Sequence, residues 1–295
     1  MNLNNKNFRV AILGSGNIGT DLMMKVQKSK YLKCEVFIGR SSNSRGMMKA
    51  IESGIKISDK SIQYIIENSG DIDLVFDATS AKDHIMHSKI LKKLGIRCID
   101  LTPAKVGPMC VPSVNAKECL TEMNINMISC GGQASIPIAK AIANTHKDVD
   151  YIEVVSSIAS KSAGPATRRN LDEYIKTTSE GLKYFSGAIK TKSILNLNPA
   201  VPHINMVTTI LAKVKKPNIK KLEKEVTKFV SKVHDYVPGY ELIFGPSLEN
   251  DRIVIMLKVR GLGDYLPKYA GNLDIINCAA IAMAVEYSKN KKNDN

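Results

Sequence analysis

The sequence contains no tryptophan, and aromatic residues make up only 5% of its 295 residues. It is also poor in acidic side chains, with 28 Asp and Glu against 42 Lys and Arg, which gives a formal net charge of +14. Proteins that bind single-stranded nucleic acid combine such charge with aromatic side chains on which bases stack. Because these are scarce here and the lysines are spread along the chain, we expect no nucleic-acid partner. The alternative is that some basic side chains bind the phosphates of a nucleotide-like substrate.

Long apolar runs are absent as well. No apolar stretch reaches the roughly 20 residues that a membrane-spanning helix needs, and the segment 1–8 is polar. The six cysteines are scattered without a C-x-x-C pair, so neither a disulfide framework nor a zinc site is indicated. We therefore expect a cytoplasmic protein with reduced thiols, no membrane partner and no bound metal.

The first motif is a glycine turn between a strand and a helix. Residues 8–13 form an apolar strand, residues 14–19 follow, and the next helix carries its apolar residues on one side. In a dinucleotide-binding fold the glycines provide a tight turn, close approach of a pyrophosphate and close helix–strand packing. The predicted cofactor contacts are Gly14, Ser15, Gly16, Asn17, Ile18 and Gly19. The alternative is a glycine-rich turn with no ligand.

The residues after the second predicted strand, 34–38, bear on the choice of cofactor. An acidic residue at this point usually holds the ribose hydroxyls of NAD, whereas this sequence continues Gly39-Arg40-Ser41-Ser42. The guanidinium of Arg40, together with the two serine hydroxyls, suits a 2′-phosphate, so NADP stays an alternative to NAD. A solvent-exposed loop with no role in binding is the other interpretation.

Two further apolar strands, within residues 71–80 and 97–104, end in polar side chains. The first delivers Asp77 to its carboxyl end and the second delivers Asp100. Such residues line the ligand crevice of an open α/β sheet, although they also serve as helix caps. His84 and His87 follow on the next helix, where we expect them to be surface or cap residues.

One cysteine stands at a position suited to chemistry. Cys130 follows a short apolar strand and precedes two glycines, and we predict a helix from about Ile136 to Ala143 with Ser135 as its cap. Backbone N–H groups and the helix dipole stabilise negative charge at such a start, which should lower the pKa of the Cys130 thiol and make it a nucleophile. The alternative is a buried cysteine that acts only as a small apolar side chain.

After residue 130 the pattern changes from alternating strands and helices to strands at 151–159, 193–197, 240–244 and 252–259, with few helices between. This pattern is typical of an α+β domain with a mainly antiparallel sheet. The predicted class is therefore α/β, with a Rossmann-like parallel-sheet domain at 1–130, completed by a C-terminal helix at 272–288, and an α+β domain at 131–271. The loop 160–170 is either a plain connection or a segment that closes over a cofactor.

Together these motifs resemble the acylating acetaldehyde dehydrogenases, which oxidise an aldehyde to an acyl-CoA with NAD and work in complex with a 4-hydroxy-2-oxovalerate aldolase. The matching segments span nearly the whole chain: residues 14–23, 73–81, 99–104, 126–137, 160–168 with 170, 236–240 and 265–275. The resemblance implies that 131–271 is a catalytic and dimerisation domain, that the protein is a homodimer, and that it serves the catabolism of aromatic hydrocarbons.

By this resemblance Cys130 is the nucleophile, and further residues contact the cofactor. These are Ser162, Ala163, Gly164, Pro165, Ala166, Thr167, Arg168, Arg169, Asn170 and Asn272. In the implied reaction the Cys130 thiolate attacks a short aldehyde, hydride passes to NAD, and coenzyme A takes the acyl group from the thioester.

The sequence departs from this family at a position that matters for proton transfer. The family's Arg-Asp pair after Met206 is replaced here by Val207-Thr208, so a carboxylate proposed as the base for the cysteine is absent. Either the helix start and the positively charged nicotinamide already ionise the thiol, which we favour, or His203 takes its proton. Two other functions stay open: a phosphate-dependent semialdehyde dehydrogenase, and a catalytically weakened subunit that binds an aldolase.

Overall fold

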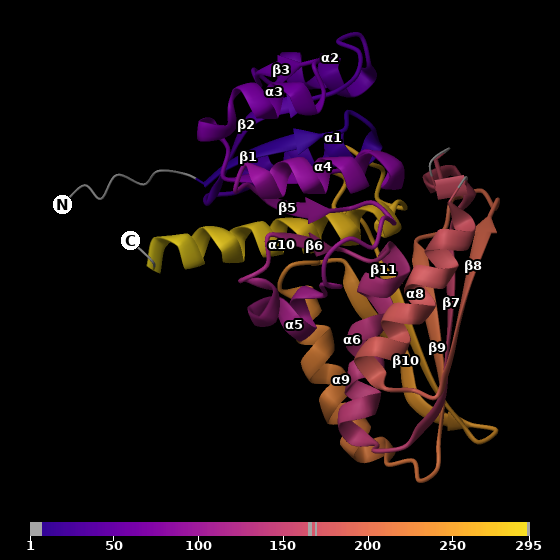
Figure 1. Cartoon of the computed structure of the whole chain (residues 1–295). Helices are drawn as coiled ribbons and strands as arrows, with labels where there is room; N and C mark the ends of the chain where they lie inside the picture. The colour runs from indigo at the N-terminus through magenta and orange to yellow at the C-terminus, as the bar shows by residue number, and fades with distance from the viewer. Residues whose placement is uncertain (1–7, 165–166, 169, 294–295) are drawn as a thin grey trace. The chain divides into compact units, whose positions relative to one another are not determined.

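The computed structural model describes residues 8–164, 167–168 and 170–293, and these divide into two compact units (Figure 1). Unit 1 takes the described residues of Met1–Cys110, Asn115–Met127 and Ala280–Asn295, and unit 2 takes Val111–Val114 and Ile128–Ala279. Helix α10 (Gly271–Asn293) is shared between them at Ala279, and helix α5 (Pro112–Cys119) is shared near its start.

Unit 1 contains an open parallel sheet. Its strands are β1 (Phe8–Leu13), β2 (Leu32–Ile38), β3 (Ile57–Ser58), β4 (Leu74–Asp77), β5 (Arg97–Asp100) and β6 (Asn124–Asn126). They lie in the order β3-β2-β1-β4-β5-β6, and every pairing is parallel. The chain order reverses between β1 and β4, and ligands of open α/β sheets bind at the carboxyl ends of the strands beside such a reversal.

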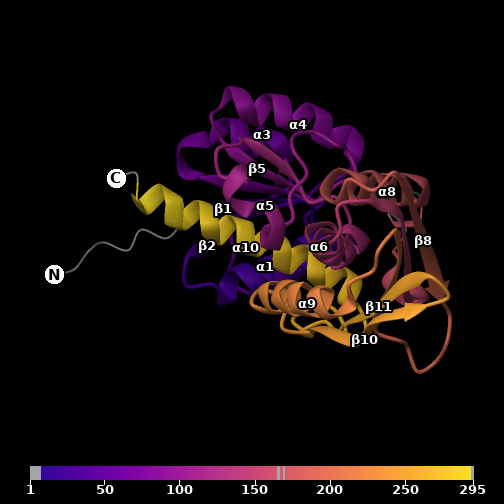
Figure 2. The ribbon, with the colours of Figure 1, turned by 90° about the horizontal axis from the view of Figure 1, so that it is seen from below.

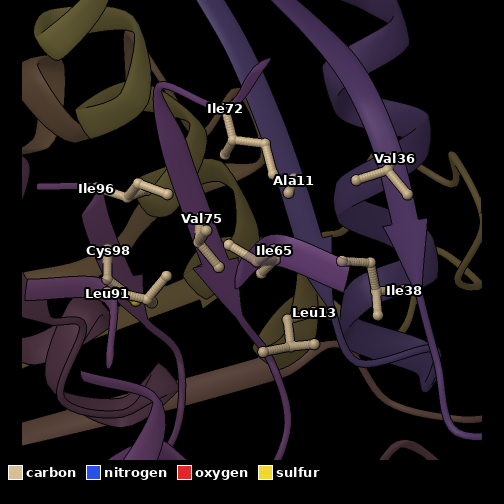
Figure 3. Close-up of a cluster of buried hydrophobic side chains, with 10 residues drawn as sticks. All are labelled: Ala11, Leu13, Val36, Ile38, Ile65, Ile72, Val75, Leu91, Ile96 and Cys98. Carbon is tan, nitrogen blue, oxygen red and sulfur yellow. The ribbon is translucent and has the colours of Figure 1, made fainter. Parts of the chain in front are cut away.

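The helices of unit 1 lie against this sheet as the apolar patterns of the strands require. They include α1 (Asn17–Lys28), α2 (Arg45–Glu52), α3 (Ile62–Glu67) and α4 (Ala81–Lys93). Alternate side chains of β1, β2, β4 and β5, such as Leu13, Ile38 and Val75, pack with Ile65 of α3 and Leu91 of α4 in one buried cluster (Figure 3). Burial of each such aliphatic side chain contributes about 1.5–3 kcal/mol, so this cluster secures the strand ends that carry the glycine turn.

Unit 2 contains a second sheet with the order β10-β11-β9-β7-β8. Its strands are β7 (Val149–Ala159), β8 (Lys190–Asn198), β9 (Met206–Val214), β10 (Tyr240–Glu249) and β11 (Arg252–Val259). The β7–β8 pairing is parallel and the other three are antiparallel. Helices α6 (Cys130–Thr145), α8 (Leu171–Ser186) and α9 (Ile219–His234) lie together on one face of this sheet, with α6 in contact with both others (Figures 1 and 2).

These sheets confirm the predicted fold class, a Rossmann-like parallel sheet and a second, mainly antiparallel sheet. Two elements of unit 2 were not predicted: strand β9 at the centre of the sheet, and helix α8. The alternation of buried and less buried residues along β9 is the sequence signal that identifies it. Helix α8 contains Thr177, Thr178, Ser179 and Gly181, which are weak helix formers, so its packing against α6 decides its conformation.

Helix α9 has one buried apolar face and one solvent-exposed face that carries its lysines. Leu222, Val226, Phe229 and Val233 are buried on one stripe, whereas the lysines of this helix are exposed. No helix among the described residues has both the length and the apolar character needed to cross a membrane.

Candidate active site

The glycine turn of unit 1 has the geometry that a bound pyrophosphate needs. Gly14 has φ +118, and a Cβ there would lie 2.5 Å from the carbonyl oxygen of Ala78. A Cβ at Gly19 would overlap the Gly14 carbonyl oxygen, so this glycine lets α1 approach the turn closely. A Cβ at Gly16 would meet nothing within 4 Å, and no side chain caps α1 at this residue. The start of α1 therefore faces open space, which suits an anionic group.

The segment after β2 is held against this turn. The Ser44 hydroxyl donates a hydrogen bond to the Ser15 hydroxyl over 3.0 Å, and a Cβ at Gly39 would lie 2.6 Å from the same oxygen. Arg40 is exposed in this segment. The structure thus brings Arg40 and the glycine turn to the same end of the sheet, where the adenosine part of a dinucleotide belongs.

The two histidines of α4 are buried, so the expected surface or cap role is wrong. The carboxylate of Asp77, also fully buried, accepts hydrogen bonds from Nδ1 of His84 over 2.9 Å and from Nδ1 of His87 over 2.8 Å. Burial alone would raise the pKa of Asp77, but these hydrogen bonds hold it well below its ordinary value. Asp77 at the end of β4 thus forms one charged cluster with His84 and His87 of α4. The spacing of residues along a helix does not indicate such a cluster.

Asp100, at the end of the neighbouring strand β5, extends this cluster. Its carboxylate accepts a hydrogen bond from Nδ2 of Asn126 over 2.8 Å and lies 3.4 Å from Nε2 of His84. Burial raises the pKa of Asp100 to about 6, against the opposing effect of His84. Burial would lower the pKa of His84, but its hydrogen bond to Asp77 and the charge of Asp100 raise it.

Cys130 lies in unit 2 as the first residue of α6, six residues before the predicted start at Ile136. The cap is Ser129 and not Ser135: the Ser129 hydroxyl accepts a hydrogen bond from the backbone N–H of Gly132 over 2.9 Å. Two consecutive glycines are poor helix formers, which explains the later predicted start. The capping bond offsets this cost and places the cysteine side chain at the N-terminus of the helix.

The pKa of the Cys130 thiol is raised, so the expected lowering is wrong for this structure. Cys130 is half-buried as a residue, and removal of its sulfur from water raises the pKa to about 11. A hydrogen bond with Tyr174 and the backbone N–H groups of Gly131 and Cys130 act in the opposite direction. The N-terminus of α6 therefore has the predicted effect on the thiol, but desolvation is larger.

The loop after β7 shows how the predicted cofactor contacts of unit 2 are arranged. Arg168 folds the loop back on itself by donating hydrogen bonds to the carbonyl oxygens of Ala163, over 3.0 Å, and Ser160, over 2.9 Å. A Cβ at Gly164 would meet nothing within 4 Å. Ser162, Thr167 and Asn170 also lie in this segment, whereas Pro165, Ala166 and Arg169 lie outside the described residues.

Beside this loop lies a cavity of about 250 Å³, lined by Ser160, Lys161, Arg168, Asn198, Pro199 and His203. Its basic side chains suit a phosphate or carboxylate. Nδ1 of His203 lies 3.2 Å from the carbonyl oxygen of Ala200, and its ring packs edge-on against Tyr269. His203 is not among the groups that shift the pKa of Cys130 in the described structure, and its role as a base stays a prediction.

Asn272, near the start of α10, satisfies a further requirement of a ligand site. Its side chain is 1% exposed, and its Oδ1 has no hydrogen-bond partner among the described residues. A buried acceptor without a donor is costly unless a ligand supplies one. The carboxamide of a nicotinamide carries such a donor, so the residues present fit the cofactor.

Comparisons with known proteins define first the class of this chain. Residues 9–122 match the family described as semialdehyde dehydrogenase, NAD binding domain, and residues 130–267 match prokaryotic acetaldehyde dehydrogenase, dimerisation. The fold is similar to that of aspartate semialdehyde dehydrogenase with NADP from Candida albicans, with a TM-score of 0.66 at 12% identity, covering 95% of this chain and all of the other. The expected class, a dehydrogenase with a nicotinamide-binding domain, is confirmed.

Close relatives then identify the family. The chain is 61% identical to an acetaldehyde dehydrogenase of Spirochaeta aurantia, over 96% of both chains, and 57% identical to one of Pectobacterium atrosepticum, over 95% of both. The chain therefore belongs to the acetaldehyde dehydrogenase family, as its motifs indicated.

Proposed function

We propose that the protein is a CoA-acylating acetaldehyde dehydrogenase that works through a thioester on Cys130. The observation that carries this proposal is the position of the thiol at the capped start of α6, within the segment that matches the acetaldehyde dehydrogenase family. The glycine turn, with its open approach at Gly16, supports binding of the dinucleotide that such a reaction uses.

The residues of the chain have distinct roles in this reaction. The Cys130 sulfur attacks the aldehyde carbonyl, and the N–H groups at the start of α6 are suited to stabilise the developing oxyanion. The bound nicotinamide supplies the hydride acceptor. Loss of a hydride from the carbon of the adduct and of a proton from its oxygen leaves a thioester on Cys130. Attack by the thiol of coenzyme A then releases acyl-CoA, and the proton of that thiol restores the cysteine.

The pKa of the thiol sets a requirement on this mechanism. With its pKa raised to about 11, the thiol is almost entirely protonated at pH 7. A thiolate must therefore gain stabilisation during the reaction, from the positive charge of the oxidised nicotinamide, from hydrogen bonds, or from both.

The acyl acceptor distinguishes the proposed function from its alternatives. We expect purified protein with acetaldehyde and NAD to form reduced cofactor only when coenzyme A is added. Dependence on phosphate would favour a semialdehyde dehydrogenase, and no turnover with either acceptor would favour an aldolase-binding subunit. Cys130→Ser should remove nearly all turnover without weakening cofactor binding, whereas Cys34→Ser, at the other half-buried cysteine, should retain it.

The choice between NAD and NADP depends on Arg40, and we propose NAD as the preferred cofactor. Titration of both cofactors into wild type and Arg40→Ala tests this, with Arg45→Ala as a control at a neighbouring exposed arginine. A preference for NADP that disappears only in Arg40→Ala would overturn the proposal, because one guanidinium–phosphate contact contributes roughly 1.5–3 kcal/mol.

We further propose that the protein forms a homodimer through the face of the second sheet opposite α6, α8 and α9. A row of paired residues crosses the sheet there: Ile194, Val155, Thr209, Met256 and Phe244. All five are at least partly exposed. An apolar sheet face of this kind is suited to a second copy, and the family description of this segment as a dimerisation domain supports it.

The aldolase partner, the role in aromatic catabolism and the cytoplasmic location stay predictions.

A further inference from the structure

A tyrosine lies against the sulfur of Cys130. The Sγ atom of Cys130 and the Oη atom of Tyr174, on α8, are 3.7 Å apart. Tyr174 is buried, and a Cβ at residue 131 would overlap its hydroxyl oxygen. Gly131 is thus the residue that gives this hydroxyl access to the thiol.

The tyrosine hydroxyl is the first of three hydroxyl groups that follow the thiol. The Ser156 hydroxyl on β7 opposes the rise in the pKa of Tyr174, and it lies 3.1 Å from the hydroxyl of Thr208 on β9. Ser156 and Thr208 face each other as paired residues of the antiparallel strands and are buried. Cys130, Tyr174, Ser156 and Thr208 therefore form a line of polar side chains that runs from the helix start into the sheet.

Hydroxyl groups both donate and accept, so this line can run in either direction. While Cys130 is a thiol, its S–H donates to the Tyr174 oxygen. Once Cys130 is a thiolate, the Tyr174 O–H turns to the sulfur and Ser156 donates to the tyrosine oxygen, with Thr208 donating to Ser156. The proton that Cys130 loses passes to solvent. Within the line only hydrogen bonds are exchanged, and the tyrosine keeps its own proton.

We propose that Tyr174 is a catalytic residue of the acylation reaction, which donates a hydrogen bond to the Cys130 thiolate, and that Ser156 and Thr208 position its hydroxyl. This rests on the proposed function for the identity of the reaction, but the hydrogen bond to the sulfur is independent of it. The pKa of Tyr174 supports the assignment: burial raises it well above its ordinary value, so the phenol stays a donor at neutral pH. Hydrogen bonds to a charged group are also about twice as strong as those between neutral groups.

The test is the pH profile of Cys130 alkylation by iodoacetamide, followed at the Cys130 peptide by mass spectrometry. We expect Tyr174→Phe, which keeps the ring that packs in the core, to move the profile to higher pH. The thiolate fraction at a fixed pH below the midpoint should fall by about 10- to 100-fold. Tyr184→Phe is the matched control, because Tyr184 lies on the same helix and is 68% exposed.

Two further variants keep the test decisive if Tyr174→Phe unfolds. Gly131→Ala should move the profile in the same direction, since its methyl group would displace the tyrosine hydroxyl. Ser156→Ala should cause a smaller shift by removing the group that holds this hydroxyl. In the acylation assay, Tyr174→Phe should lower kcat and leave the Kd for NAD unchanged.

Failure of this inference is separable from failure of the proposed function, because alkylation needs neither aldehyde nor coenzyme A. Profiles of Tyr174→Phe and Gly131→Ala that coincide with that of wild type would overturn the role of Tyr174. A shifted profile in a protein that forms no acyl-CoA would instead overturn the proposed function and leave the hydrogen bond to Cys130 established.

Discussion

Replacing Asp77 by Asn should destabilise the protein by roughly 3–5 kcal/mol, the cost of breaking a buried ionic cluster from one side. The carboxylate is fully buried and accepts hydrogen bonds from Nδ1 of His84 and of His87 through one oxygen, and from the N–H and hydroxyl of Thr79 through the other. An asparagine has one acceptor oxygen, so its NH₂ group must face either two imidazole donors or the Thr79 N–H.

Each placement leaves at least one buried donor without an acceptor, at about 1–3 kcal/mol, and removes charge-assisted hydrogen bonds. The free energy of unfolding should be measured by urea denaturation monitored by circular dichroism. Asp71→Asn is the control, because Asp71 pairs with Arg9 at the surface with its side chain 69% exposed and should change stability by less than about 1 kcal/mol. Equal effects of the two variants would refute the reasoning that burial makes the Asp77 cluster important.

Three further outcomes follow from the structure. The pKa of Asp100 is raised to about 6, and the pKa of His84 is raised as well. The protonated forms of both groups therefore stabilise the fold, and this contribution to the free energy of unfolding should be lost as pH rises through their pKa values in the folded protein. In urea titrations at a series of pH values, Asp100→Asn should remove the part of this loss that falls between about pH 4 and 6. Gly16→Ala should weaken NAD binding by roughly tenfold or more in calorimetry without changing Tm, because its methyl group would enter the open space at the start of α1. The control Gly70→Ala also places a methyl group in open space and should leave both NAD affinity and Tm unchanged. Equal NAD affinities in the two variants would contradict the pyrophosphate site. Met256→Glu should convert the homodimer to a monomer, as measured by light scattering, whereas the control Lys228→Glu on the exposed side of α9 should not. A Met256→Glu protein that stays dimeric would place the interface elsewhere.

The local signals of the sequence were enough for the first motif and for most of the strands. A glycine turn between an apolar strand and an amphipathic helix depends on neighbours within about ten residues, and the backbone at Gly14 and Gly19 has the geometry expected of it. The buried face of α9 was also predictable, since a stripe of apolar residues at helical spacing needs no knowledge of its partner.

The chemistry around Cys130 depended on tertiary structure. The sequence placed the thiol near a helix start, but the start lies six residues earlier than predicted because a Ser129 cap outweighs two glycines. The sign of the pKa shift follows from desolvation by packed elements, which has no local sequence signature.

Tertiary structure also decided which residues far apart in the sequence come into contact. The residues next to His84 and His87 in the sequence favour a position at the surface. Both histidines are nevertheless buried, because the carboxylate of Asp77 accepts their hydrogen bonds and that of Asp100 lies beside His84. Tyr174 follows Cys130 by 44 residues and reaches it only because α8 packs on α6 and Gly131 lacks a side chain. Periodicity and propensity describe one element at a time, and only the packing of helices on a sheet decides which polar groups meet in a buried site.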